Sequence, residues 1–446
     1  MKTQKHWLLA LLSLALPIAF QTALFSSKSM IDTVMLGSLN PLDMAAMGLA
    51  TKAHMVLSFC IIGVAIGGGQ VAAQCYGGKV NDKFVRVCLI MLALAAVIAL
   101  SCAGLVFVGS DAIMAFGSSD YAIIEQGSLY LQIIAPTFVL FAITLSLATV
   151  LRTMFKPMAA TVVSLIGVAL NIALNINFIP KWGITGVAIG TLIAACVETL
   201  LLIGFVIYKR WFSFKQIKQV WGTTRLSDAT VVIQLSSVAA LNSVIWSLGL
   251  YVFHSLLGKQ SNDVLIILGA LAPIESIAAA LLIGFASAAS VVIGNHSGQR
   301  AMDDIQYLLP RYLSLSLISG LFLSLLLYFC QPLVLAFIAS DNPALQETAR
   351  FAYQILIAAM ALKGLSMMFM IGILRAGGDA KYCLGVDVFC QWVVLLPLTY
   401  YFLTTGIEPV QILLLMIVEE VIKIGLCIQR LMSGRWVKVH SDRVQA

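Results

Sequence analysis

"GVAIGGGQVAAQCYGGKVND" at residues 63–82 recurs 221 positions later as "GFASAASVVIGNHSGQRAMD" at residues 284–303. The aligned pairs include Gly63 with Gly284, Gly77 with Gly298, Lys79 with Arg300, and Asp82 with Asp303. At the same offset "AFGSSD" (115–120) aligns with "AFIASD" (336–341), and at 223 positions the "LR" of 151–152 aligns with that of 374–375. Similarity at a nearly constant offset along a whole chain indicates an internal duplication.

The composition places the duplicated chain in a membrane. Of the 446 residues, 61% are hydrophobic and 11% are charged, and the mean hydropathy is +0.99. A soluble protein of this length needs fewer apolar residues for its core. Apolar stretches of about 20 residues, long enough to cross a bilayer, recur from one end to the other. The first begins at Trp7 and lacks the small-residue cleavage site of a removable signal, so we expect it to be retained.

Charged or turn-rich breaks divide the apolar sequence into twelve predicted spans. Six lie in the first half, at residues 7–37, 44–77, 84–109, 121–151, 157–179 and 185–208. Six lie in the second half, at residues 228–258, 264–298, 306–338, 344–375, 382–404 and 408–430. We therefore predict an N-terminal lobe at 1–210, a cytoplasmic linker at 211–227, a C-terminal lobe at 228–432 and a cytoplasmic tail at 433–446.

The basic residues orient these spans. Most of the 27 lysines and arginines fall in alternate loops and at the termini, which predicts that both ends of the chain are cytoplasmic. Because each half has an even number of spans, the two repeats share one orientation, and a pseudo-two-fold axis along the membrane normal would relate them. Two parallel six-helix lobes with a central cleft suit transport by alternating access.

We expect no nucleic-acid partner.

One carboxylate, Asp32 in "SMIDTVMLG" (29–37), lies near the end of the first span. An ionised group in hydrocarbon costs roughly 3 kcal/mol, so it normally faces a protein interior or a water-filled cavity. The fifth span carries Asn171 and Asn175 on one helical face, and the sixth carries Thr191 at a similar depth. These four residues predict a polar pocket for the coupling proton or cation. The second half lacks this set, since Phe253 stands at the position equivalent to Asp32.

A purely structural role is the alternative, because polar residues in membrane bundles also join helices through hydrogen bonds. Lys28 lies one helical turn before Asp32 and would favour its ionised form, whereas burial would favour the protonated form. The sequence leaves the balance open. Pro17 interrupts the same span and permits a kink, which is either static or a means by which the first span bends in response to Asp32.

Other charges lie within the predicted spans. Glu198 and Glu275 are near mid-membrane, and Asp387 is near the cytoplasmic end of its span. Each either contacts a cationic substrate or joins helices. Glu419 and Lys423 are spaced i,i+4 and predict an ion pair.

The sequence argues against several other functions. It shows no CxxC pair, no histidine cluster, no glycine-flanked nucleophilic serine and no paired aspartates in a GxGD setting. We therefore expect no catalytic residues, no metal and no cofactor. No filter-like loop or ring of charge indicates a channel.

Four segments resemble the multidrug and toxic compound extrusion (MATE) family of transporters. They are "IDTVMLGSLNPLDMAAMGLA" (31–50), "GGQVAAQCYGG" (68–78), "LNIALNINFIPKWGITGVAIGTLIA" (170–194) and "ILRAGGDAKY" (373–382). The resemblance covers almost the whole chain. It implies two six-helix lobes that form a V-shaped cavity, and export of cationic amphiphilic compounds driven by a proton or sodium gradient.

Within that family the chain is most similar to the bacterial DinF-type branch, which implies a first-lobe proton site at Asp32 and Asn171. A second carboxylate of some members is Asn175 here. The glutamate of the NorM-type branch aligns with Trp246, and its loss favours protons over sodium. The NorM-type aspartate has a match in Asp379. The expected protein is a proton-coupled multidrug antiporter in a bacterial inner membrane, monomeric, in contact with membrane lipids. The alternatives are a sodium-coupled antiporter with the same pocket and a flippase for lipids or lipid-linked sugars.

Overall fold

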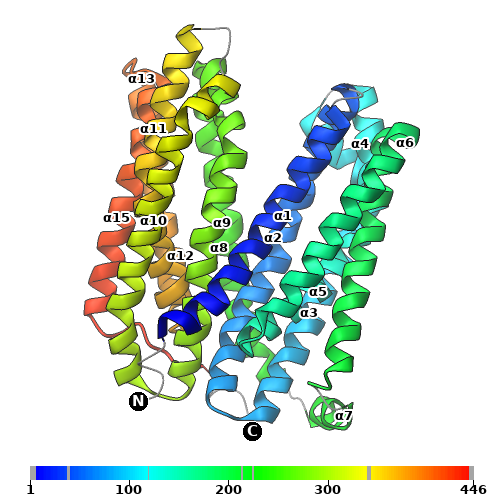
Figure 1. Cartoon of the computed structure of the whole chain (residues 1–446), viewed down its shortest axis with the longest axis vertical. Helices are drawn as coiled ribbons and strands as arrows, with labels where there is room; N and C mark the ends of the chain where they lie inside the picture. Colours follow the sequence, from blue (N-terminus) through cyan, green and yellow to red (C-terminus); the bar gives the residue numbers. More distant parts are fainter. Residues whose placement is uncertain are drawn as a thin grey trace. The chain divides into compact units, whose positions relative to one another are not determined.

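A computed structural model describes residues 7–37, 41–118, 120–211, 214–223, 226–338 and 343–440, and all regular structure in these ranges is helical (Figure 1). The first half comprises α1 (Trp7–Gly37), α2 (Pro41–Gly77), α3 (Asn81–Gly117), α4 (Tyr121–Ile134), α5 (Thr137–Thr153) and α6 (Pro157–Tyr208), followed by α7 (Phe214–Thr223). The second half comprises α8 (Leu226–Gln260), α9 (Asn262–Gly298), α10 (Met302–Ile338), α11 (Pro343–Met367), η1 (Met368–Arg375), α12 (Ala380–Val388), η2 (Phe389–Leu395), α13 (Leu396–Thr404), α14 (Pro409–Ile412) and α15 (Leu414–Met432). The chain is an all-α polytopic membrane protein.

The apolar helices account for the predicted spans. Among the described residues, nine helices are long and apolar enough to cross a membrane, and the α4/α5 pair, bent by 47°, makes a tenth. α6 contains two predicted spans, because it turns at Gly183, whose φ of 53° and ψ of −130° are not helical. α14 and α15 together cover the last predicted span, and α15 carries Glu419, Glu420 and Lys423. With α6 divided and α15 included, the described helices correspond to the predicted spans.

The duplication is visible in the backbone. α2 and α9 each have 37 residues, as do α3 and α10, and their bounds differ by the sequence offset. The residues with positive φ also pair between the halves: Lys79 with Arg300, Phe155 with Gly378, Gly183 with Gly406, and Arg210 with Gly434. A left-handed backbone conformation is rare for residues other than glycine, so its recurrence at Lys79 and Arg300, with φ of 58° and 57°, shows that both halves fold alike.

Backbone contacts group the chain into two compact units. Unit 1 comprises Met1–Ala23 and Asn242–Val439, and unit 2 comprises Leu24–Leu241 and His440–Ala446. The boundaries fall inside α1 and α8, so each of these helices contributes one segment to each unit. The predicted lobes follow the chain instead of the contacts, and their boundaries stay a prediction, as does the cleft between them.

Small residues allow the first part of α1 to pack in unit 1 and the first part of α8 to pack in unit 2. In unit 1, a Cβ on Gly284 of α9 would lie 2.5 Å from Cβ of Ala19 in the first part of α1. In unit 2, a Cβ on Gly63 of α2 would clash with Ala240 in the first part of α8. Gly63 and Gly284 are repeat partners, and so are Ala19 and Ala240. Such small-residue crossings let helix backbones approach closely.

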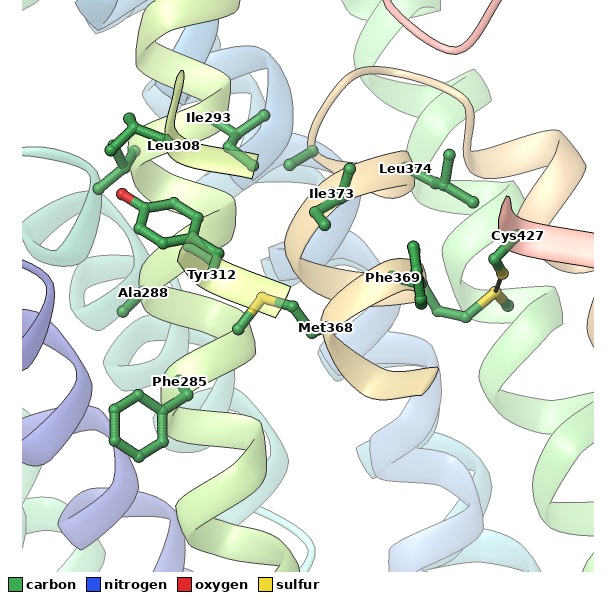
Figure 2. Close-up of a cluster of buried hydrophobic side chains, with 14 of the residues drawn as sticks. Phe285, Ala288, Ile293, Leu308, Tyr312, Met368, Phe369, Ile373, Leu374 and Cys427 are labelled. Atoms are coloured by element: carbon green, nitrogen blue, oxygen red, sulfur yellow. Dashed lines mark hydrogen bonds between the residues drawn. The ribbon is translucent and has the colours of Figure 1, made fainter. Parts of the chain in front are cut away.

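One of the apolar cores of unit 1 gathers side chains from α1, α9, α10, η1, α12, η2 and α15. It includes Leu14, Tyr312 and Ile373, each no more than 1% exposed. Figure 2 shows part of this cluster, with Phe285 and Ala288 of α9, Tyr312 of α10 and Met368 of η1. The first part of α1 is thereby held by the core of unit 1.

Ion pairs and hydrogen bonds join helices and the C-terminal segment within each unit. In unit 2, Arg86 of α3 forms an ion pair with the buried Asp228 of α8 and donates to Thr223 of α7. In unit 1, Asp379 forms two ion pairs. Its Oδ2 lies 2.7 Å from Nη2 of Arg430 in α15, and its Oδ1 lies 2.5 Å from Nζ of Lys438 in the C-terminal segment. Asp379, which aligns with the NorM-type aspartate, is thus a tether for the C-terminal segment.

Candidate functional site

The carboxylate of Asp32 is buried in unit 2 and receives a hydrogen bond from α6. Its residue is 5% exposed, and Asn175 is fully buried. Nδ2 of Asn175 lies 2.5 Å from Oδ1 of Asp32. When the acceptor is ionised, such a bond is roughly twice as strong as one between neutral groups.

A second polar pair extends this contact. Nδ2 of the buried Asn171 donates to Oγ1 of Thr191 at 3.2 Å. The Thr191 oxygen accepts that bond, so its own O–H is free to donate, and it hydrogen-bonds to Asp32. The structure thus brings together the four residues that the sequence predicted as one pocket, with N–H and O–H donors converging on Asp32.

The turn within α6 makes this arrangement possible. Asn171 and Asn175 lie before the turn at Gly183, and Thr191 lies after it, so the helix folds back and places them opposite one another. Oδ2 of Asp43, in the first turn of α2, lies 3.4 Å from the backbone N of Ile184. A carboxylate at a helix N-terminus satisfies an N–H group that has no partner within the helix. Sequence reasoning missed Asp43, which resembles any acidic residue in a first helical turn.

Two acceptors in the pocket have no donor. Oδ1 of Asn171 and Oδ1 of Asn175 are buried without a hydrogen-bond partner among the described residues. Gly190 makes room for the second, because a Cβ there would lie 2.8 Å from Oδ1 of Asn175. Buried polar atoms in native proteins nearly always have partners. These two oxygens are therefore suited to accept a hydrogen bond from a protonated carboxyl group or a water molecule, or to coordinate a cation.

Glu198 also lies at the contact between the two parts of α6. Oγ of Ser164 donates to its Oε1 at 2.7 Å, so the two parts of α6 pair Ser164 with Glu198 and Asn171 with Thr191. Lys28 of α1 is half-buried and interacts electrostatically with both Asp32 and Glu198. Lys28 and Glu198, which the sequence offered as possible charge sites, thus belong to the surroundings of Asp32.

Tyr130 and His54 also lie in this region, and sequence reasoning assigned neither of them to the pocket. Tyr130 of α4 is 5% exposed, interacts electrostatically with Asp32 and hydrogen-bonds to Thr51 of α2. His54 of α2 lies 3.3 Å from Oγ1 of Thr137 and stacks on Phe138 at 4.3 Å between ring centroids. A tyrosine in an apolar helix carries no periodic pattern that separates a pocket from a lipid face.

The remaining predicted residues lie in unit 1. Glu275 of α9 forms an ion pair with Lys363 of α11. Asp387 of α12 is 7% exposed and forms an ion pair with Lys423 of α15. Pro17 lies inside α1, on the unit 1 side of the boundary after Ala23. These residues lie in a different unit from Asp32.

The comparisons with known proteins agree with this architecture. The MatE family model matches residues 17–176 and 238–401. The chain belongs to the MatE family. The two matched segments begin 221 positions apart, so the match repeats the internal duplication.

The similar proteins are transporters. The uncharacterized transporter YisQ of Bacillus subtilis (strain 168) is 21% identical over 445 residues, covering 96% of this chain and 95% of YisQ. A crystal structure of the Vibrio cholerae MATE transporter VcmN superposes with a TM-score of 0.88 at 17% identity, covering 98% of this chain and 100% of VcmN. A MOP superfamily transporter from Pyrococcus furiosus, described as having a binding pocket of reversed polarity, gives 0.85 at 16% identity, covering 95% and 96%. This MatE protein therefore shares the MATE transporter fold.

Proposed function

We propose that this MatE protein is a secondary active antiporter that exports cationic amphiphilic compounds in exchange for protons. Asp32 binds the proton, and Asn171, Asn175 and Thr191 hold the carboxyl group in both protonation states. The observation that carries the proposal is a buried carboxylate beside an asparagine whose Nδ2 donates to it and whose Oδ1 lacks a donor.

The hydrogen-bond inventory gives the proposed chemistry. An ionised Asp32 accepts from Asn175 and Thr191. A protonated Asp32 is neutral, so these contacts weaken, and its new O–H can donate to an unpaired amide oxygen in the pocket. The change is confined to one carboxyl group on α1. Bending of α1 at Pro17 then provides the proposed conformational response, because proline removes one backbone hydrogen bond from the helix.

Exchange requires that proton and substrate oppose one another. If protonation of Asp32 lowers the affinity for a cationic substrate, the bound substrate lowers the proton affinity by the same factor. We further propose a DinF-type protein, monomeric in a bacterial inner membrane with both termini cytoplasmic, as the basic loops and the motif resemblance support.

A sodium-coupled antiporter is the second candidate. Carboxylate, amide and hydroxyl oxygens are the ligands that hard cations prefer, and the pocket offers all three kinds. Among the described residues no group of three or more His, Cys, Asp or Glu side chains is arranged to hold a metal ion. Sodium would instead be held by the Asp32 carboxylate together with the Thr191 hydroxyl and the two amide oxygens.

Reconstitution in liposomes tests the proposal. Ethidium transport is followed under an imposed pH gradient and then under a sodium gradient, for the wild type, Asp32→Asn and the control Asp111→Asn, which alters an exposed carboxylate of α3. Transport driven by pH, abolished by Asp32→Asn and preserved in the control, supports the proton mechanism. Transport driven by sodium alone makes the pocket a cation site. Undiminished pH-driven transport by Asp32→Asn overturns the assignment of Asp32.

A further inference from the structure

A second buried charged network lies in unit 1, at positions that are not repeat partners of the Asp32 pocket. Its centre is Lys423 of α15, whose Nζ lies 2.8 Å from Oε1 of Glu419 and 3.3 Å from Oδ1 of Asp387. Glu420 also interacts electrostatically with Lys423 and accepts a hydrogen bond from Ser366 of α11. We call Asp387, Glu419, Glu420 and Lys423 the Lys423 network.

The network holds more negative than positive charge. Its four residues are 5–8% exposed, and they comprise three carboxylates and one ammonium group. Two negative charges are therefore in excess when every carboxylate is ionised. The nearby Lys363 already has a partner in Glu275. Uncompensated charge buried within a membrane protein is costly, and it is normally neutralised by a partner or by proton uptake.

The hydrogen bonding of Asn242 in α8 indicates that a proton neutralises part of the excess negative charge. It is 7% exposed, and its Nδ2 donates to Oδ2 of Asp387 at 2.8 Å. Its Oδ1 has no hydrogen-bond partner among the residues that the structure describes. Asn175 stands in the same relation to Asp32 in unit 2. A protonated carboxyl group supplies the O–H donor that such an oxygen lacks.

The geometry disfavours a metal ion at this place. The ammonium group of Lys423 already lies between the carboxylates of Glu419 and Asp387, at the position that a cation would need. A proton adds no volume and binds directly to a carboxylate oxygen.

We propose that the Lys423 network binds one exchangeable proton and is a second protonation site of the transporter. Uptake converts one carboxylate oxygen to O–H and removes one of the two excess charges. Glu275, with its side chain 34% exposed, pairs with Lys363. The Ser366 hydroxyl contacts the backbone oxygen of Lys363 and the carboxylate of Glu420, so Glu275 is the accessible end of a chain of contacts to the network. This inference goes beyond the proposed role of Asp32 and does not depend on it.

Four further titratable groups interact electrostatically with the network: Lys363 of α11, Cys383 of α12, Cys390 of η2 and Cys427 of α15. His254 of α8 and Glu275 of α9 interact with Lys363 and with each other, so they act on the network through Lys363.

Infrared spectroscopy of the purified full chain in lipid nanodiscs tests the proposal. The carboxylic C=O band is followed between about pH 6 and 8, above the range in which exposed carboxylates titrate, in an Asp32→Asn, Glu198→Gln background, which removes the two acids of the Asp32 region. We expect a band that titrates. An amide at any one network carboxylate mimics the protonated state, so Asp387→Asn, Glu419→Gln and Glu420→Gln should each abolish it. The matched control Asp303→Asn, at an exposed first-turn residue of α10, should leave it unchanged.

A variant with the opposite effect strengthens the test. Lys423→Met removes the only ammonium group of the network, so proton uptake should rise about twofold. Absence of a titrating band in the background protein overturns the proposal without any network substitution, so a folding defect in a variant cannot decide the result. Persistence of the band in all three amide variants overturns it as well.

Discussion

Gly190→Ala should uncouple the pocket without touching any charged group. A Cβ at position 190 would lie 2.8 Å from Oδ1 of Asn175 and 3.4 Å from Cβ of Leu174. The first distance is shorter than real Cβ contacts, so the Asn175 carboxamide must move. Its Nδ2 is the atom that donates to Asp32 at 2.5 Å, and that hydrogen bond would lengthen or break.

The expected size follows from the bond that is lost. A hydrogen bond to a charged group contributes about 1.5–3 kcal/mol, and each 1.4 kcal/mol is a factor of about ten in an equilibrium. We therefore expect proton-driven ethidium transport to fall about 10- to 100-fold in proteoliposomes. Alanine is favoured over glycine in a helix by about 0.8–1 kcal/mol, which offsets part of the stability lost with this hydrogen bond.

Gly204→Ala is the matched control, because it makes the same change in the same helix where a Cβ would meet nothing within 4 Å. Both variants gain the same helix propensity, so the difference between them isolates the displacement of Asn175. Equal transport rates in the two variants would refute the argument that the Asn175 carboxamide holds Asp32.

Three further changes test other parts of the structure. Thr191→Val keeps the side-chain shape but removes the hydroxyl oxygen that accepts the hydrogen bond from Asn171. Because a buried donor left unpaired costs about 1–3 kcal/mol, proton-driven transport should fall. An unchanged rate would show that the hydroxyl is dispensable. Asp43→Ala removes the N-terminal cap of the second part of α6 and should lower stability by about 1 kcal/mol, measured by thermal unfolding. Gly284→Leu should destabilise unit 1 by about 1–3 kcal/mol through overpacking, whereas Gly104→Leu, at a site open to its surroundings, should not; equal melting temperatures would contradict the close crossing.

The sequence predicted the elements of the Asp32 pocket because helical geometry is regular. Counting residues from span ends placed Asp32, Asn171, Asn175 and Thr191 at one depth, and the hydrogen bonds among them follow from that depth. The i,i+4 spacing also predicted the ion pair between Glu419 and Lys423, which the structure confirms.

Contacts without local spacing escaped prediction. Asn242 and Asp387 are 145 residues apart, and no periodicity connects them. Gly190 matters through the space it leaves for a distant side chain, which one sequence does not reveal. The π-helical segments η1 and η2 were also missed, because a run of apolar residues looks the same at either helical period.

The reciprocal contribution of α1 and α8 bears on the origin of the chain. Each unit is completed by the first part of a helix that belongs to the other half of the sequence, and equivalent glycine and alanine residues form both crossings. A single repeat produced alone would therefore lack that segment until a second copy supplied it. Two separate copies of the repeat could complete one another by exchanging these helix ends, and the basic segment after α6 joins the two repeats in one chain. Cutting the chain there should yield fragments that fold only when they are expressed together.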